Sequence, residues 1–184
     1  LSTQSLSLSV YNCGWLNATY FDDLTAGVIY NLDAACEYGA SEYLNSYGRL
    51  YNWYAVDDAR GLCPSGWHVP TDGEFMTLEM ELGMSESEAN GTGMRGTDQG
   101  TQMKSSASDS PSWDGTNTSG FSGLAGGARN FNGVFYNEGN GGYCWSASAN
   151  GTDAWYRLLD GGSTEVYRNN HYQRNGFSVR CVRD

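Results

Sequence analysis

Alternation of apolar and polar residues predicts a strand near the start of the chain. Residues 5–10 read Ser-Leu-Ser-Leu-Ser-Val, which is the period of a strand with one buried face. Residues 17–47 then mix tyrosine, aspartate and glycine without a clean period. We expect loops with short ordered pieces in that part of the chain.

Two helices are predicted in the first half. Thr71 is followed three residues later by Glu74, the spacing of a capping box in which each side chain bonds a backbone N–H at the other position. Apolar residues then recur at helical spacing, at Phe75, Leu78 and Leu82. The pattern predicts a helix over about 72–82. Residues 50–56 are interpreted as a shorter helix, because three apolar side chains share one face, those of Leu50, Trp53 and Tyr54.

The second half changes from a loop to strands. Residues 84–120 are polar, rich in glycine, serine and threonine, and predict one long loop of the kind that is often functional. After Phe121 short strands alternate with turns, such as Asn132-Gly133 and Gly161-Gly162. The predicted strands are 122–129, 133–136, 142–148, 154–159, 163–168 and 176–183. Early helices and a late antiparallel sheet predict an α+β fold.

Composition and charge exclude two classes of partner. The chain has 184 residues, which fits one domain, and a net charge of −11. Without a basic run it is not expected to bind nucleic acid, and no apolar run approaches the roughly 20 residues that membrane insertion needs. Only 17% of the residues are charged. The surface is therefore built from serine, threonine, asparagine, glycine and tyrosine, which is common in extracellular binding proteins.

Cysteine and histidine usage argues against a metal or redox centre. Five cysteines occur without a C-x-x-C pair, and His68 and His171 are the only histidines. Scattered cysteines favour disulfides in an oxidising compartment, and the odd number leaves at least one thiol unpaired or paired elsewhere. We expect no cofactor and no metal centre. A structural calcium ion remains an alternative at Asp22-Asp23, Asp57-Asp58 or Asp160.

For several short motifs we prefer a structural or chance explanation over a functional one. Gly91 to Gly96 match G-x-G-x-x-G, but no strand leads in and no helix follows, so we interpret the match as chance. His68 is interpreted as a packing residue rather than a catalytic base, because no nucleophile is placed beside it. Glycosylation sequons occur at four positions, Asn17, Asn90, Asn117 and Asn150.

Four strings together resemble a known family. Residues 47–53, 63–72, 116–122 and 176–184 read YGRLYNW, CPSGWHVPTD, TNTSGFS and GFSVRCVRD. In this order they resemble the Fibrobacter succinogenes major paralogous domain, which is common on surface proteins of Bacteroidetes-like bacteria. The resemblance covers about residues 45–184. We therefore predict a lectin-like domain over 45–184 and an N-terminal extension of strand and loops, residues 1–44, packed on it.

The resemblance implies a fold and a set of disulfides. The family is similar to the C-type-lectin-like fold in its formylglycine-generating-enzyme variant, with two short helices packed on twisted antiparallel sheets. It implies a Cys63–Cys181 disulfide, worth about 4–5 kcal/mol by loop entropy. Cys13–Cys36 would be a second disulfide, and Cys144 would be left over. The calcium-binding sugar triplets and the paired reactive cysteines of such relatives are absent, so we expect neither calcium-mediated sugar binding nor catalysis.

These observations predict a non-enzymatic binding or adhesion module, extracellular and located on a cell or virion surface. The expected partner is a surface glycan or a protein receptor. The candidate ligand residues combine aromatic rings, arginines and amides in the late segment. They are Trp155, Tyr156, Arg157, Tyr167, Arg168, Asn170, His171 and Tyr172.

Three alternatives remain at this point. Strand alternation places Trp155 and Arg157 on one face and Tyr156 on the other, so that some of these residues belong to a core. The protein is alternatively a structural subunit or decoration of a filament or virion, self-associating through residues 5–10 or through the acidic half. That half, residues 1–88, holds 13 acids and 2 arginines. A third interpretation is a diversified recognition surface in the C-terminal segment.

Overall fold

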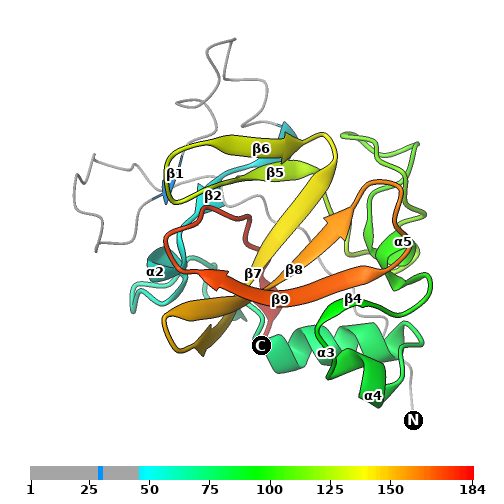
Figure 1. Ribbon diagram of the computed structural model, residues 1–184, viewed down its shortest axis with the longest axis horizontal. Coiled ribbons are helices and arrows are strands. Elements are labelled where there is room, and N and C mark those ends of the chain that lie inside the picture. The colour runs from blue at the N-terminus through cyan, green and yellow to red at the C-terminus, as the bar shows by residue number, and fades with distance from the viewer. Residues whose placement is uncertain (1–28, 31–45) are drawn as a thin grey trace.

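The computed structural model describes residues 29–30 and 46–184 (Figure 1). This part of the chain is mixed α+β, mostly sheet with a few short helices, which confirms the predicted class. The helices are α2 (Trp53–Val56), α3 (Asp72–Glu81), α4 (Glu86–Ala89) and α5 (Gln99–Met103). The predicted strand at 5–10 and the predicted Cys13–Cys36 disulfide lie outside the described residues.

A six-stranded sheet dominates the described chain, with strand order β4-β9-β8-β7-β5-β6. The pairs are antiparallel except β5 with β7, which run parallel at Gly127 and Gly142. The strands of this sheet are β4 (Gly93–Arg95), β5 (Gly126–Arg129), β6 (Phe135–Glu138), β7 (Gly141–Asn150), β8 (Asp153–Asp160) and β9 (Val166–Tyr172). Two small sheets pair β1 (Ile29–Tyr30) with β2 (Leu50–Tyr51), and β3 (Trp67–His68) with β10 (Val182–Arg183).

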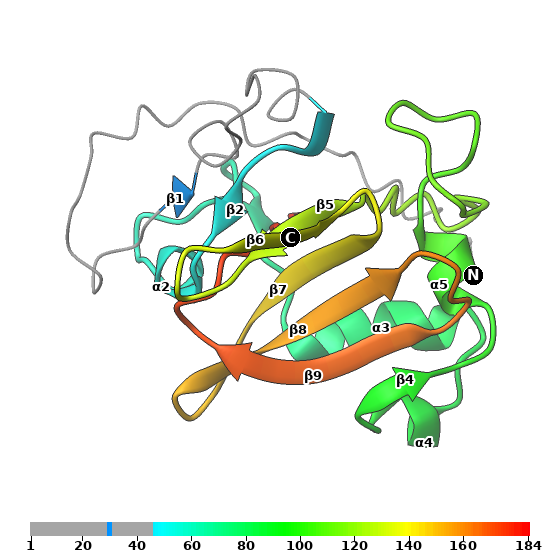
Figure 2. The same cartoon turned by 45° about the horizontal axis from the view of Figure 1, so that its top comes forward.

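The capping box predicted for α3 is present. The Thr71 hydroxyl accepts the Glu74 N–H at 3.2 Å, and Glu74 Oε2 accepts the Thr71 N–H at 2.7 Å. Both bonds satisfy N–H groups that a helix start leaves without partners, which is worth about 1 kcal/mol. The helix ends at Glu81, close to the predicted end at residue 82. Figure 2 shows α3 crossing behind β8 and β9.

The prediction of one long loop over 84–120 is wrong. This segment contains α4, β4 and α5. Ser85 and Glu88 form a second capping box that the sequence analysis missed. β4 and α5 are too short and polar to show a period, and their partners lie far along the chain. β4 pairs with β9, and the Gly100 N–H in α5 donates to the Thr164 carbonyl at 2.8 Å.

Residues 50–56 are only partly helical. Leu50 and Tyr51 are extended as β2, and Tyr51 also bridges Phe177. The Asn52 side chain then accepts the Ala55 N–H at 3.1 Å and begins α2. Long-range pairing therefore overrides the helical spacing of the apolar residues at the start of this segment.

Each predicted late strand has a counterpart, although the bounds differ. Ser122 adopts a φ of 51°, which ends any strand there, and β5 begins only at Gly126. Most of 176–183 is irregular, with single bridges such as Tyr51 to Phe177, and only Val182–Arg183 form a strand. The turns predicted at Gly133 and Gly162 are confirmed by their left-handed φ values of 95° and 77°.

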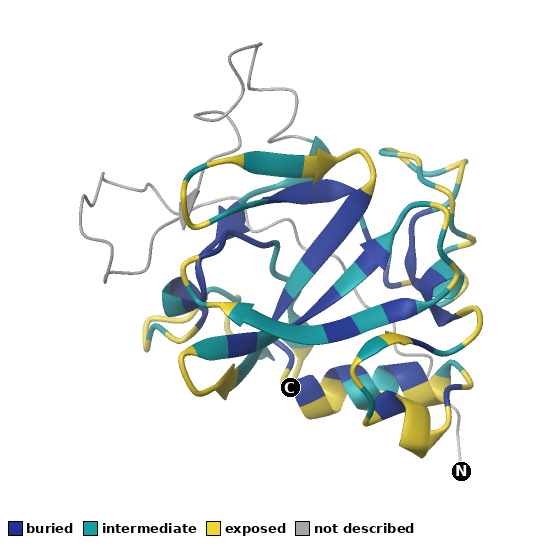
Figure 3. Ribbon diagram, viewed as in Figure 1, coloured by how far each residue is buried: buried dark blue, intermediate teal, exposed yellow. Residues whose placement is uncertain are grey.

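Hydrophobic cores lie on both faces of the six-stranded sheet. The first cluster includes Trp53, Trp145, Tyr156 and Phe177. The second joins Phe75 of α3 to Leu159 and Val166 of the sheet. Figure 3 shows buried residues running along β7 and β8 through the middle of the sheet. Because both faces are covered, neither face of β8 is free to bind a ligand along its whole length.

A disulfide joins two distant parts of the chain. Cys63 and Cys181 are bonded and lie 118 residues apart in the sequence, as the family resemblance implies. Cys144 is a free cysteine and is half-buried. The disulfide lies next to the β3–β10 pair, so that the C-terminal strand is fixed both covalently and by hydrogen bonds.

Candidate ligand-binding surface

Two of the predicted ligand residues, Arg157 and Arg168, are structural. The Arg157 guanidinium bonds Asp72 Oδ1 at 2.7 Å and Glu79 Oε1 at 2.6 Å. Arg168 bonds both carboxylate oxygens of Asp72, at 3.0 and 2.6 Å, and Arg95 binds Glu79 at 2.8 and 3.0 Å. This buried charge network joins α3 to β4, β8 and β9, so these arginines do not face a ligand.

The network keeps the Asp72 carboxylate ionised. Burial raises the pKa of Asp72, but the hydrogen bonds and charges of Arg168 and Arg157 outweigh it and hold that pKa below its usual value. Three guanidiniums share two carboxylates, and Arg168 donates further bonds to the Asn90 and Gly91 carbonyls, each at 3.0 Å. A buried network of this kind is strongly destabilised when one carboxylate is removed.

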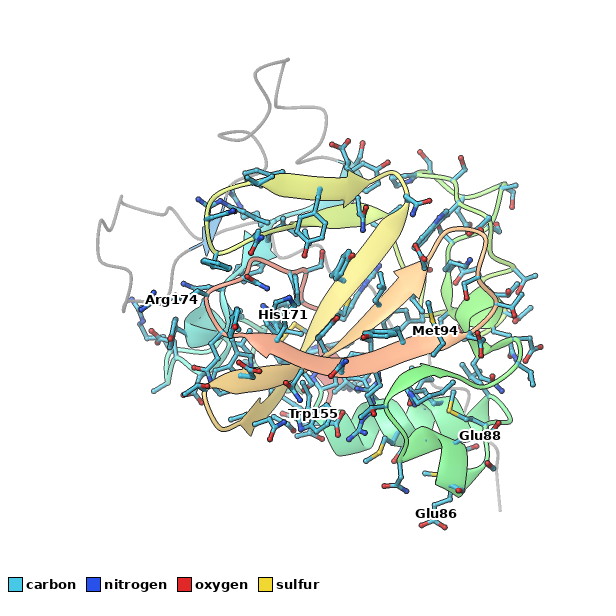
Figure 4. All side chains as sticks on the ribbon, in the orientation of Figure 1. Glu86, Glu88, Met94, Trp155, His171 and Arg174 are labelled. Atoms are coloured by element: carbon cyan, nitrogen blue, oxygen red, sulfur yellow. A yellow bond between two sulfur atoms is a disulfide. The ribbon has the colours of Figure 1, made fainter. Side chains whose placement is uncertain are left out.

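The two aromatic residues of β8 lie on opposite faces of the sheet. Tyr156 is buried in the core around Phe177, with ring centroids 5.0 Å apart. Trp155 is half-buried on the α3 side, where the Arg168 guanidinium stacks 4.0 Å from its ring centroid. Figure 4 shows Trp155 and His171 on opposite sides of the β9 ribbon. The predicted ligand residues therefore do not form one surface.

A row of tyrosines crosses the face opposite α3. The ring centroids of Tyr136 and Tyr143 are 5.6 Å apart, those of Tyr143 and Tyr156 6.1 Å, and those of Tyr156 and Tyr167 6.1 Å. Burial, with a smaller effect of Tyr143, raises the pKa of Tyr136 to about 12, and burial also raises the pKa of Tyr156. The phenols of Tyr136 and Tyr156 therefore stay protonated at neutral pH.

The Tyr156 ring lies 6.2 Å from the ring of His171, which belongs to an exposed group of residues next to the tyrosines. We call this group the aromatic rim, and it is made of Phe131, Val134, His171 and Tyr172. Phe131, Val134 and Tyr172 are 53%, 57% and 54% exposed, which is unusual for large apolar side chains. The Tyr172 ring packs edge-to-face on Phe131 at 5.7 Å and contacts His171 at 5.4 Å. The rim joins the β5–β6 turn to the end of β9, two segments about forty residues apart in the sequence.

Hydrogen bonds hold the rim in place. The Phe131 N–H donates to Oδ1 of the fully buried Asn175 at 2.9 Å. Nδ1 of His171 accepts the Tyr172 N–H at 2.9 Å, and burial lowers the pKa of His171. His171 is therefore neutral, with its proton on Nε2. The rim is a pre-organised apolar surface, and within the described part of the chain the Nε2–H of His171 has no hydrogen-bond partner.

The structure thus divides the eight predicted residues. Tyr156, Arg157 and Arg168 are buried, Trp155 and Asn170 pair with each other across β8 and β9, and only His171 and Tyr172 belong to the rim. Tyr167 is half-buried beside Tyr156, and its hydroxyl accepts the Asn169 amide at 2.8 Å. Sequence reasoning missed two further rim residues, which flank the Asn132-Gly133 turn as an exposed apolar pair, Phe131 and Val134.

No reactive centre emerges among the described residues. No group of three or more histidine, cysteine or acidic side chains there is arranged to hold a metal ion. Burial raises the pKa of the Cys144 thiol to about 11, so it is not an activated nucleophile. A cavity beside Cys144, lined also by Phe121 and Leu159, measures about 10 Å³. That space holds at most one water molecule.

His68 bridges two carboxylates instead of facing a substrate. Its Nδ1 lies 2.6 Å from Asp184 Oδ1, and its Nε2 lies 2.8 Å from Glu74 Oε1. The hydrogen bonds to Asp184 and Glu74 raise the pKa of His68. With both ring nitrogens donating, the imidazolium connects β3, the chain end and the start of α3.

The described sequons differ in accessibility. Asn90 is exposed but its amide donates to the Glu86 carbonyl at 2.9 Å. Asn117 is half-buried and donates to Ser122 Oγ at 2.8 Å. Asn150 is exposed at the β7–β8 turn. Asn17 lies outside the described residues.

Comparison with known proteins identifies the family. The model of the Fibrobacter succinogenes major domain matches residues 14–183, and the chain belongs to this family. The match begins ahead of the boundary that the sequence analysis placed at residue 45. Comparisons with curated proteins and with solved structures found no match. No helix in the described ranges is long and apolar enough to cross a membrane.

Proposed function

We propose that this protein is a non-enzymatic, extracellular binding or adhesion module whose aromatic rim contacts a glycan or a protein surface. The observation that carries this proposal is the exposure of the Phe131 and Tyr172 rings, which pack on each other, with the exposed Val134 in the same turn as Phe131. Contiguous exposed apolar groups mark interaction sites, whereas scattered ones do not.

The chemistry of the rim suits binding without reaction. Its aromatic rings offer large rigid contact area, and neighbouring amides such as Asn130 and Asn132 offer adaptable hydrogen bonds. Asn175 fixes the Phe131 backbone from below, so little conformational entropy is lost when a partner binds. The buried, high-pKa thiol of Cys144 gives no support to catalysis.

The finer fold and the location belong to the same proposal. A C-type-lectin-like fold is supported by the disulfide that ties Cys63 to the C-terminal strand and by the long β7–β8 hairpin at the centre of the sheet. An oxidising, extracellular location is supported by that disulfide. In this arrangement the rim is carried on a rigid frame.

The test is a binding comparison of single variants on glycan arrays and intact cells. Tyr172→Ala is expected to weaken binding about tenfold or more, as for a central aromatic contact. Met94→Ala is the matched control, because Met94 is 41% exposed on β4, away from the rim, and should leave binding unchanged. Equal binding by both variants and the wild type on every surface that the wild type binds would remove the rim as the contact site.

A structural subunit is the second candidate. β6 is an outer strand of the six-stranded sheet, and an outer strand is a site where another chain can add. However, Asn137 within β6 has a φ of 58°, a left-handed kink that interrupts the regular edge. Light scattering at high concentration tests this candidate, since monomers alone would count against it and extended polymers would favour it.

A further inference from the structure

Five Asn-Gly pairs occur in the chain and all lie among the described residues. Asn-Gly is the dipeptide most prone to spontaneous deamidation, because glycine has no side chain to shield its backbone nitrogen. The reaction needs a free Gly N–H, a free Asn side chain and local freedom to bring them together. The five sites therefore form an internal comparison within one fold.

Two pairs are held by bonds on both partners. At Asn90 the amide donates to the Glu86 carbonyl, and the Gly91 N–H donates to the Glu88 carbonyl, both at 2.9 Å. Asn175 is fully buried with its Oδ1 accepting the Phe131 N–H. The N–H of Gly176 donates to the Arg129 carbonyl at 2.8 Å.

Two further pairs also have a hydrogen-bonded Asn side chain, and in the first of them the Gly N–H is bonded as well. Asn132 Oδ1 accepts the Val134 N–H at 3.2 Å, while the Gly133 N–H donates to the Asn130 carbonyl at 2.9 Å. The Asn140 amide donates to Asp160 Oδ1 at 3.0 Å, and the buried Gly141 is already part of β7. In each of these pairs a bond must break before ring closure.

The fifth pair is different. Asn150 and Gly151 are exposed at the tip of the β7–β8 hairpin. Within the described chain, neither the Asn150 side chain nor the Gly151 N–H makes a hydrogen bond. A Cβ added at Gly151 would meet no atom within 4 Å, so the space beside this backbone is open.

We propose that Asn150 is a site of spontaneous modification, converted by intramolecular deamidation while the other four pairs stay intact. The deprotonated Gly151 nitrogen attacks Asn150 Cγ, a new N–Cγ bond forms, and the Cγ–Nδ2 bond breaks as ammonia leaves. Water then opens the succinimide at either carbonyl and yields aspartate or isoaspartate. No oxidant or other co-reactant is needed.

The modification would reach the loop that carries the rim. The Gln173 side chain, next to Tyr172, donates to the Asp153 carbonyl at 3.1 Å and lies 3.5 Å from the Gly151 carbonyl. Isoaspartate inserts a CH₂ group into the backbone of this turn and adds a negative charge. The inference itself does not depend on the proposed function, because the modification is measured directly.

The experiment is a time course of the native protein at mildly alkaline pH, followed by peptide mapping with fragment-ion assignment. Tryptic cleavage at Arg129 and Arg157 places Asn132, Asn140 and Asn150 in one peptide, so that they are compared internally. We expect a mass gain of about one dalton at Asn150 first, with conversion several-fold faster than at any other Asn-Gly pair.

Two controls complete the test. In reduced, unfolded protein the five pairs should convert at similar rates, and Asn150→Gln should remove the early product from the native protein. The proposal is overturned if another pair converts as fast as Asn150 in the folded state. It is equally overturned if native Asn150 stays unchanged while the unfolded sample converts.

Discussion

The side chain of His68 connects two parts of the molecule through hydrogen bonds to two carboxylates. Its ring lies between Glu74, which also caps α3, and Asp184 beside the C-terminal strand. Both bonds are at their strongest only when the ring is protonated and the carboxylates are ionised. At 40% side-chain exposure, solvent screens the interaction, and we expect a contribution below about 1 kcal/mol.

The pH dependence of this bridge follows from the direction of each pKa shift. The pKa of His68 is raised above 6.5, so its stabilisation is complete below that pH and disappears as pH rises through the folded-state value. The pKa of Glu74 is lowered below 4.5, because hydrogen bonds from Thr71 and His68 outweigh the effect of burial. Its contribution is present above pH 4.5 and is lost as pH falls further.

We therefore predict that His68→Gln destabilises the protein most between about pH 4.5 and 6.5. Urea unfolding of both proteins across this range and up to pH 9 measures the difference. It should shrink steadily above pH 6.5. A difference that is constant from pH 5 to pH 9 would show that the ring acts by packing alone.

At the scale of elements, the buried charge network fixes α3 against the sheet. Glu79 neutralises two arginines, since Arg95 bonds both of its oxygens and Arg157 bonds one. Among the described residues Arg95 pairs with no second carboxylate, and the network there holds one more cation than anion. The two ends of this network are therefore not equivalent.

We predict that Glu79→Gln costs about 3–5 kcal/mol of unfolding free energy, because the buried Arg95 loses its carboxylate partner and Arg157 loses one of its two. Arg95→Met should cost distinctly less, since two cations and two carboxylates remain. Denaturant unfolding of both variants gives the comparison. A larger loss for Arg95→Met than for Glu79→Gln would contradict this description of the network.

One position within β5 requires a glycine. Gly127 has a φ of 66°, and an added Cβ would lie 2.6 Å from the Tyr136 carbonyl oxygen. Gly139 has a similar φ of 75° but open space around it. Comparing alanine substitutions at these two glycines therefore distinguishes the cost of backbone strain, present at both, from the cost of a steric clash, present only at Gly127.

Gly139→Ala is expected to cost about 1–2 kcal/mol, the ordinary penalty of left-handed backbone. Gly127→Ala should cost more, because the hairpin must also move apart. Thermal unfolding monitored by circular dichroism measures both. Equal melting temperatures for the two variants would mean that the hairpin absorbs the clash freely.

Sequence patterns predicted the elements whose signals are local. The Thr71–Glu74 capping box and the alternation in β8 are set by neighbouring residues, and both are confirmed. Pairings with distant segments, such as β4 with β9, leave no local period and were missed. The candidate site was mispredicted for the same reason, because contacts with distant segments bury some of its residues. Arg157 looks like a surface residue until Asp72, 85 residues earlier, is placed against it.

At the scale of the whole molecule, the surface lacks lysine. Lys104 is the only lysine and is 1% exposed. Its ammonium donates to the Asp160 and Ser163 carbonyls at 3.0 and 2.8 Å and pairs with Asp114 at 2.7 Å. Each of the three ammonium protons of Lys104 therefore has an acceptor, and the buried amine is shielded from solvent.

We predict that an amine-reactive ester modifies the native protein at the α-amino group and not at Lys104. Denatured protein should gain a second label. Intact-mass spectrometry and peptide mapping detect the difference. Rapid labelling of Lys104 under native conditions would show that the loop around Asp114 opens readily.

If the aromatic rim contacts the partner, a competition between variants on cells reveals it. Labelled wild-type protein is bound to cells and challenged with excess unlabelled protein, either Phe131→Ser/Tyr172→Ser or Met94→Ser. We predict that the Met94 variant displaces the label as well as the wild type does, whereas the double rim variant leaves it bound. Equal displacement by both variants would show that the partner does not bind at the rim.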